Sequence, residues 1–262
     1  MIDFTYHTFL KLLQSLKQSG HCFISASDYF KGSTASRFIL LRHDVEKHYD
    51  HALWFAREEN KMRIKGTYYF RFSPKNYNKE IVEKIANLGH EIGYHYDDLS
   101  QCKGNFEEAI DRFQKNLRNL REVAPVETIC MDGSPMSKHD NRELWKENDY
   151  KSLGLIGEPY IDIDFNEVIY YTDTGRRWNG NKFSVRDRVS TDKAMTTSRR
   201  PQFRTTHDII RAAALNQLPN KLMFTFHPQR WTDRPMPWVK ELLYQNTKNI
   251  VKRFLVKKNE NH

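Results

Sequence analysis

Apolar residues in the first half of the chain recur with two alternating periods. Positions spaced three and four residues apart predict helices, and apolar runs of four to eight residues predict buried strands. The predicted strands are residues 37–44, 66–72, 90–96 and 126–132. Helices are predicted over residues 51–61, 78–89 and 105–123, and Phe9, Leu12, Leu13 and Leu16 predict a further helix that ends before Gly20. Because strands alternate with helices, we predict a parallel sheet whose strands are joined by helical crossovers.

The regular alternation stops at residue 133 and returns after residue 205. Turn signals and one short predicted strand, 167–171, occupy the interval. The pattern then predicts a helix over 207–216, a strand over 221–227 and a long helix over 236–256. No linker or internal repeat divides the sequence. We therefore predict one α/β domain over residues 1–262, with an irregular insertion around 133–205.

The charge of the chain bears on its partners. The formal net charge is +9, and part of the excess lies in residues 196–204 and 251–258. A basic balance attracts nucleic acid, acidic lipid or an anionic substrate. The sequence contains neither zinc-finger spacing nor a stripe of basic and aromatic residues. We therefore expect no nucleic-acid partner, and binding of an anionic polymer stays a third hypothesis that steep salt dependence would support.

Cysteine usage and hydropathy bear on location. Cys22, Cys102 and Cys130 are widely spaced and form no CxxC pair. Reduced thiols in a cytosolic protein are the simplest interpretation of this pattern. The first residues lack the apolar core of a signal peptide, and no apolar run approaches the roughly 20 residues of a membrane helix. We expect a cytoplasmic protein without a membrane span.

Acid–base side chains follow four separate predicted strands. Asp44 and Glu46 come at the end of the first, His95 near the end of the third, and Asp132 and His227 directly after the apolar runs of the fourth and the last. The carboxyl ends of parallel strands lie on one side of an α/β fold, so these groups would converge if the sheet curls into a barrel. Carboxylates and imidazoles bind divalent ions such as zinc, and a catalytic site leaves one position for water. This pattern predicts a metal-assisted hydrolytic site.

Three strings in the sequence carry a family resemblance. "RFILLRHDVE", "NLGHEIGYHYDDL" and "MFTFHPQRW" together resemble the polysaccharide deacetylase superfamily, also called the NodB-homology or carbohydrate esterase family 4 group. They are most similar to a branch found with surface-polysaccharide genes. The resemblance covers roughly residues 37–132 and 221–231. It implies a (β/α)7 deformed TIM-like barrel, a divalent metal and removal of acyl groups from amino sugars.

The resemblance also implies a role for individual residues. Asp44 would be the catalytic base, His227 the catalytic acid, and Glu46 and His95 metal ligands. The family places a second metal-binding histidine where this chain has Leu99, which cannot bind a metal. Four residues are candidates to complete the metal site: Asp97, Asp98, Asp132 and His227.

Structural interpretations of the same residues remain open. Asp44 and Glu46 could pair with Arg42 or His43 at a strand end, and His95 could be a hydrogen-bonded core histidine. Such clusters of charge are common at strand ends.

Residues 172–180 also have two interpretations. They could form only a turn, or they could bind substrate, with Trp178 stacking on a sugar ring and Arg176 and Arg177 holding a phosphate or carboxylate. Arg230 and Trp231 lie beside His227 in the sequence and allow the same interpretation. We also place Asp132 among the candidate substrate-binding residues.

Two functional hypotheses follow. The first is a hydrolase that uses a divalent metal, with zinc as the first candidate, to remove an acyl group, most simply N-acetyl, from a carbohydrate or sugar precursor in polysaccharide biosynthesis. The alternative is a degenerate barrel that binds a glycan or sugar nucleotide without hydrolysis. The leucine at position 99 is the main support for the alternative.

Overall fold

The structure is a computed structural model that describes residues 2–33, 35–73, 77–134, 137–179 and 201–259. Its strands form one sheet in the order β5-β4-β3-β2-β7-β6, with β1 also beside β2. The strands are β1 (Cys22–Ile24), β2 (Phe38–Val45), β3 (Thr67–Phe70), β4 (Glu91–Tyr96), β5 (Val126–Met131), β6 (Ile169–Thr172) and β7 (Lys221–Phe226). Every pairing between these strands is parallel, which confirms the prediction made from the alternation of elements.

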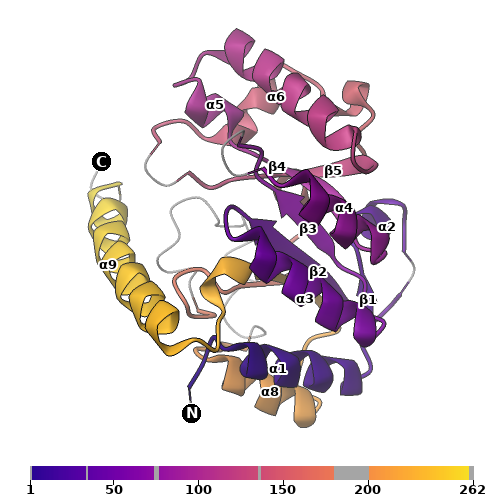
Figure 1. Ribbon diagram of the computed structural model, residues 1–262, viewed down its shortest axis with the longest axis vertical. Helices are drawn as coiled ribbons and strands as arrows, with labels where there is room; N and C mark the ends of the chain where they lie inside the picture. Colours follow the sequence, from indigo (N-terminus) through magenta and orange to yellow (C-terminus); the bar gives the residue numbers. More distant parts are fainter. Residues whose placement is uncertain (1, 34, 74–76, 135–136, 180–200, 260–262) are drawn as a thin grey trace.

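Helices surround this sheet (Figure 1). The α-helices are α1 (Tyr6–Gln18), α2 (Ala26–Phe30), α3 (Tyr49–Lys61), α4 (Lys79–Asn87), α5 (Asp98–Gln101), α6 (Phe106–Arg121), α7 (Pro159–Asp162), α8 (Thr206–Ala214) and α9 (Pro235–Asn259). Short 3-10 helices are η1 (Asn141–Lys146), η2 (Tyr150–Leu153) and η4 (Pro228–Arg230). Helices α1 and α8 lie side by side, and α9 runs along one side of the molecule. Within the described residues, no helix combines the length and apolar character needed to cross a membrane.

The central strand β2 contributes side chains to two of the hydrophobic clusters. It pairs with β7 on one side and with β1 and β3 on the other. Successive side chains of a strand point to opposite faces. Ile39 and Leu41 join the main cluster, which includes residues of α1 and α3, whereas Phe38 and Leu40 join a second cluster with Met223 of β7. The second face of β2 therefore changes from apolar at its start to charged at its carboxyl end.

The segment after η2 bridges the two edges of the sheet. Gly157 forms a parallel bridge with Thr128 of edge strand β5. A few residues later, the Tyr160 hydroxyl lies 3.0 Å from the hydroxyl of Tyr170 in the other edge strand, β6. The parallel seven-stranded sheet with its surrounding helices is therefore consistent with a deformed (β/α)7 barrel, as the sequence predicts.

The interval that we expected to be irregular contains local structure. Its described residues form η1, η2, α7 and β6. The part from 180 to 200, with most of the basic segment 196–204, lies outside the described residues. The sequence reasoning missed β1 and α2, because elements of three and five residues are too short to display a period. The assignment of residues 1–262 to one domain stays a prediction.

Candidate metal and catalytic site

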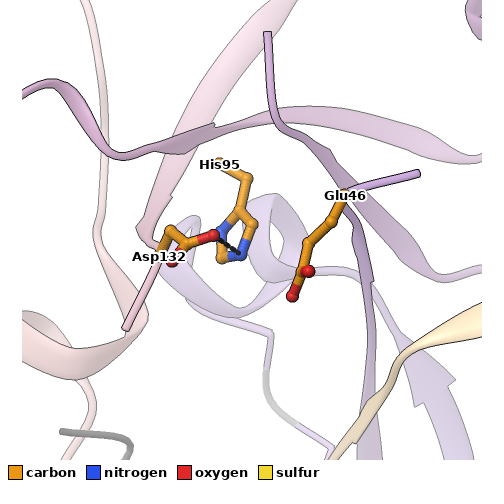
Figure 2. Close-up of side chains that lie close together, drawn as sticks. All are labelled: Glu46, His95 and Asp132. Atoms are coloured by element: carbon orange, nitrogen blue, oxygen red, sulfur yellow. Dashed lines mark ion pairs between the residues drawn. The ribbon is translucent and has the colours of Figure 1, made fainter. Parts of the chain in front are cut away.

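Three side chains from different strand ends face a common space (Figure 2). Glu46 follows β2, His95 lies near the end of β4, and Asp132 follows β5. Each offers one ligand atom, and these atoms all lie within 4.8 Å of one another. His95 Nε2 is 3.8 Å from Asp132 Oδ2. The strand ends thus bring together the two predicted metal ligands and one of the four candidates to complete the site.

A hydrogen bond fixes the tautomer of His95. Its Nδ1 lies 3.0 Å from the carbonyl oxygen of Cys130. A carbonyl oxygen only accepts, so Nδ1 carries the hydrogen and Nε2 presents a lone pair when the ring is neutral. That lone pair faces Oδ2 of Asp44 and Oδ2 of Asp132, each 3.8 Å away. A cation between these electron-rich atoms would stabilise them. The hydrogen bond from Nδ1 to a backbone carbonyl is also usual for histidines that bind a metal through Nε2.

The donor set suits a divalent ion. One imidazole and two carboxylates match the ligands of catalytic metal sites, where three protein ligands leave a position for water. Burial would raise the pKa of Asp132, but His95 and Arg71 hold it below its usual value, so the carboxylate is ionised at neutral pH. Leu99 is completely buried in the main hydrophobic cluster. In the described residues the third donor is therefore Asp132, from another strand.

Asp44 forms a two-point ion pair with Arg42. The guanidinium donates from Nε to Oδ1 and from Nη2 to Oδ2, both at 2.7 Å. The two residues are two positions apart on β2, so they share one face of the strand. Burial would raise the pKa of Asp44, but Arg42, His95 and His227 lower it to about 2. Asp44 is therefore ionised at every physiological pH.

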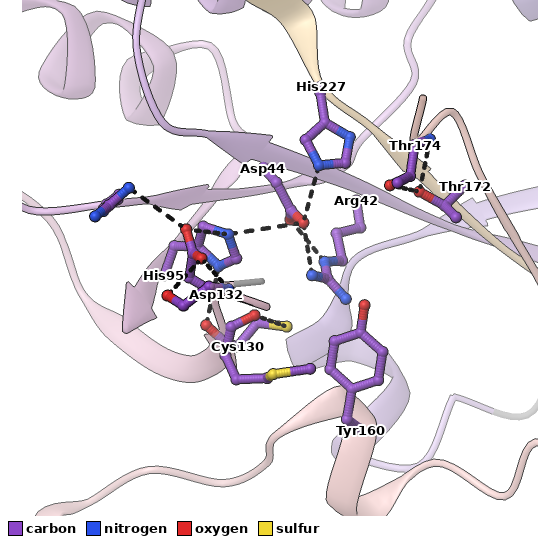
Figure 3. A network of polar contacts seen from close by, with 12 residues as sticks. Arg42, Asp44, His95, Cys130, Asp132, Tyr160, Thr172, Thr174 and His227 are labelled. Carbon is purple, nitrogen blue, oxygen red and sulfur yellow. Dashed lines mark hydrogen bonds and ion pairs between the residues drawn. The ribbon is translucent and has the colours of Figure 1, made fainter. Parts of the chain in front are cut away.

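His227 lies on the other side of Asp44 (Figure 3). Its Nε2 is 3.9 Å from Asp44 Oδ2, while its Nδ1 is 2.6 Å from Oδ1 of Asp173. Asp173 is completely buried and also accepts hydrogen bonds from Trp231 Nε1 at 2.7 Å and Arg230 Nη1 at 3.0 Å. Burial raises the pKa of Asp173, but His227 and Arg230 outweigh that effect and lower it. Asp173 therefore fixes the His227 ring with Nε2 turned toward Asp44.

These groups open into a pocket of about 840 Å³. The predicted site residues that line it are Asp44, Glu46, His95, Asp132, His227 and Arg230. The pocket thus brings together the proposed base, acid and metal ligands, together with two of the proposed substrate-binding residues.

Trp178 lies in the hydrophobic core instead of on a sugar-binding platform. Only 2% of its surface is exposed, and its ring packs edge-on against Phe224 and Phe226. Its Nε1 donates a hydrogen bond to Thr206 Oγ1 at 2.9 Å. The indole is therefore buried, and its polar atom is bonded within the protein. The expectation of sugar stacking must be corrected at this position.

Three further candidates also lie away from the pocket lining. The Arg176 guanidinium sits over the rings of Trp238 and Phe4 and donates to the Trp238 carbonyl, where it supports the start of α9. Arg177 donates from Nε to Asn179 Oδ1 at 2.7 Å. Trp231 is completely buried and orients Asp173. None of these three side chains is among the described residues that line the pocket, and only Trp231 reaches the site, through Asp173.

Asp97 and Asp98 are directed toward α6 instead of toward the three donor atoms. Arg112 of α6 donates to Asp97 Oδ1 at 3.3 Å and to Asp98 Oδ1 at 2.6 Å. Asp98 also accepts a hydrogen bond from Tyr94, and Asp97 pairs with Arg71. Both acids therefore connect the end of β4 to neighbouring elements.

Sequence reasoning missed Asp173 as a site residue. Its position directly after the apolar strand β6 was the available signal, because Asp132 stands in the same relation to β5. The sequence interpretations of residues 172–180, a turn or a substrate-binding segment, do not place Asp173 with the other strand ends. Arg42 was noted only as a possible partner of the acids.

Comparisons with known proteins find similarity in structure alone. No protein-family model matches the chain, and no curated protein matches it. A carbohydrate esterase family 4 (CE4) pseudoenzyme from Bacillus anthracis is 14% identical, with 83% of this chain and 62% of that chain covered, at a TM-score of 0.46. A CE4 esterase from Streptococcus mutans is 12% identical, with 90% of each chain covered, at a TM-score of 0.44. For PdaA from Bacillus subtilis, a family 4 carbohydrate esterase, the identity is 12%, the coverage 90% and 83%, and the TM-score 0.41.

These solved structures come from the group that the sequence motifs resemble. The chain spans less than two thirds of the length of the pseudoenzyme.

Proposed function

We propose that this protein is a metal-dependent hydrolase that removes an acyl group, most simply N-acetyl, from a carbohydrate or sugar precursor. The observation that carries the proposal is the position of Asp44 between two imidazoles. His95 Nε2 and His227 Nε2 lie 3.8 and 3.9 Å from Asp44 Oδ2. A base, an acid and three metal donors at one pocket are the groups that amide hydrolysis requires.

The roles follow from the chemistry of each group. Glu46, His95 and Asp132 would hold a divalent ion, which when bound makes water more acidic and polarises an acyl carbonyl. Asp44 is ionised and accepts the proton of the attacking water. Its low pKa makes it a weak base, so it depends on a water that is already acidified. Arg42 holds the carboxylate in place through both of its oxygens.

His227 would protonate the leaving amine. An amide nitrogen leaves readily only after it receives a proton, and Nε2 is the ring atom that faces the pocket side of Asp44. Asp173 binds Nδ1 and stabilises the positive charge that the ring carries before it donates. Trp231 and Arg230 in turn hold Asp173, which keeps this acid fixed relative to the base.

The finer assignments belong to the same proposal. We propose zinc as the metal because the donors are imidazole nitrogen and carboxylate oxygen. A carbohydrate or sugar-nucleotide substrate of polysaccharide biosynthesis, and a place in the cytoplasm, are proposed from the motifs and the composition of the sequence.

One observation favours the alternative of a binding protein without hydrolysis. Leu99 occupies the position of an expected ligand and is buried in the core. The proposed metal ligands therefore include one imidazole in place of two. If the metal bound too weakly for catalysis, the barrel would bind a sugar without hydrolysing it.

Metal analysis and one substitution separate these functions. Zinc should copurify or bind at one ion per chain, and an anomalous-scattering map of a zinc-soaked crystal should place it among Glu46, His95 and Asp132. A chain that binds sugar but no metal would establish the alternative.

The second test uses Asp44→Asn with Asp111→Asn as a matched control. Asp111 is an exposed residue of α6 that is not part of the pocket lining. Acetate release from a panel of N-acetylated sugars should fall at least about 10²-fold in Asp44→Asn and stay unchanged in the control. Full activity of a folded Asp44→Asn variant would refute Asp44 as the base.

A further inference from the structure

Helix α9 forms an outer wall of the pocket. Its lining residues are Glu241, Tyr244, Gln245, Thr247 and Lys248. On the inner side, Glu46 and Lys47 line the pocket at the end of β2. The pocket thus has a floor of acids and imidazoles and a wall of different composition, which the mechanism above does not use.

Tyr244 lies at the centre of this wall. Tyr244 is 47% exposed and lines the pocket, so part of the residue is accessible to a ligand. The ammonium group of Lys248 is 4.6 Å from the ring centroid and that of Lys47 is 5.5 Å from it. Elements far apart in the sequence therefore place two cations around one exposed aromatic ring.

The cations of the pocket differ in their pairing. Arg71 pairs with Asp97, and Arg230 pairs with Asp173. Among the described residues, Lys47 and Lys248 form no ion pair with a carboxylate. The nearest acid on the helix, Glu241, accepts a hydrogen bond from Gln245 at 2.7 Å. Two like charges at one ring repel each other, and an anion between them would relieve that repulsion.

We propose that Lys47, Tyr244 and Lys248 form a subsite for a phosphate or diphosphate attached to the sugar of the substrate. The inference rests on the proposed function and specifies its substrate as a glycosyl phosphate. Lysine binds phosphate as a point charge, and an aromatic ring packs against a sugar or base. Ligand pockets of 300–1,000 Å³ hold drug-sized molecules, so about 840 Å³ has room for a sugar and its anionic group.

Calorimetric titration of metal-free protein tests this subsite. Without metal, inorganic diphosphate and UDP cannot bind through an ion at the catalytic floor. Both probes should bind the original chain, and Lys47→Gln combined with Lys248→Gln should weaken binding at least tenfold. The control is Lys240→Gln, which removes one positive charge from an exposed residue of α9 outside the pocket lining, and each single variant, Lys47→Gln and Lys248→Gln, is compared with it. The control should change the affinity less than twofold.

Three results would overturn the subsite: no binding of either probe, equal binding by the double variant, or an equal loss in the Lys240→Gln control. Diphosphate binding by a chain that hydrolyses nothing would keep the subsite and reject the hydrolase. Turnover of a neutral N-acetylated sugar by a chain that does not bind diphosphate would keep the hydrolase and reject the subsite.

A second comparison of binding affinities distinguishes a nucleotide-linked from a lipid-linked sugar substrate. Nucleotide-linked and lipid-linked sugars share a diphosphate. Tighter binding of UDP than of inorganic diphosphate supports a nucleotide-linked substrate. Tighter binding of farnesyl diphosphate in phosphatidylcholine vesicles supports a lipid-linked one.

Discussion

Removal of the Arg42 charge should destabilise the protein strongly at neutral pH. The side chains of Arg42 and Asp44 are 1% and 5% exposed. The pKa of Asp44 falls from the ordinary 3.8 to about 2. At 1.36 kcal/mol per unit, that shift corresponds to about 2 kcal/mol of stability. Because the folded pKa is depressed, this contribution is present above pH 4 and is lost as the pH falls toward 2.

The variant Arg42→Gln leaves a buried carboxylate without its partner. Breaking a buried pair in this way costs about 3–5 kcal/mol. The cost should be smaller at pH 5 than at pH 8, because the unpaired Asp44 can take up a proton. A second change, Asp44→Asn, removes the buried charge and should recover much of the loss. The coupling energy of the double-mutant cycle should therefore be at least about 2 kcal/mol at pH 8.

The cycle compares the original chain, Arg42→Gln, Asp44→Asn and the double variant. Their free energies of unfolding are measured in urea with a metal chelator present, by tryptophan fluorescence and circular dichroism. Arg142→Gln is the matched control. Arg142 also binds an aspartate two residues away through two nitrogens, but Arg142 and Asp140 are 31% and 24% exposed. The control should cost less than about 1 kcal/mol. If Arg42→Gln lowered the free energy of unfolding at pH 8 by as little as the control does, burial would not be what makes the Arg42–Asp44 pair important for stability.

The remaining predictions concern the metal, the acid and a buried carboxyl. Asp132→Ala should lower zinc affinity at least about tenfold in competition with a chelator, and unchanged affinity would remove Asp132 from the metal site. Asp173→Asn should lower kcat at least about 10²-fold while KM changes little; a KM effect alone would contradict a role through His227. Burial raises the pKa of Glu158 from 4.5 to about 7, although the Met131 amide and Arg42 oppose the shift. The folded state therefore loses stability as the pH rises from 4.5 to 7, and Glu158→Gln should gain about 3 kcal/mol relative to the original chain between pH 4.5 and pH 8. A difference in unfolding free energy that does not vary with pH would contradict this linkage.

Much of the fold could be predicted from the sequence, because long apolar runs and helical stripes decide element type. The same reasoning predicted that polar groups at strand ends would lie on one side. The order of strands could not be obtained in this way. Placement of β7 beside β2, which brings His227 next to Asp44, depends on how the whole sheet curls.

The details of the site were harder to predict for physical reasons. Asp97, Asp98 and Asp132 all follow strands. Contacts that the sequence does not display, with Arg112 of α6 for both Asp97 and Asp98 and with Tyr94 for Asp98, distinguish these two acids from Asp132. Trp178 illustrates a second limit. An aromatic residue in a polar loop has the same sequence signature whether its ring meets a sugar or fills a core.

Strand β2 joins the reacting groups to the most protected part of the molecule. Hydrogen bonds from neighbouring strands hold it on both sides, and Arg42 lies opposite both Thr67 and Thr225. Amide protons of such a strand should exchange with solvent only when the whole chain unfolds. Helix α9 is instead an element added to one side, after the last strand. Evolution could therefore alter α9 to accept a new substrate while the inherited chemistry of β2 is preserved.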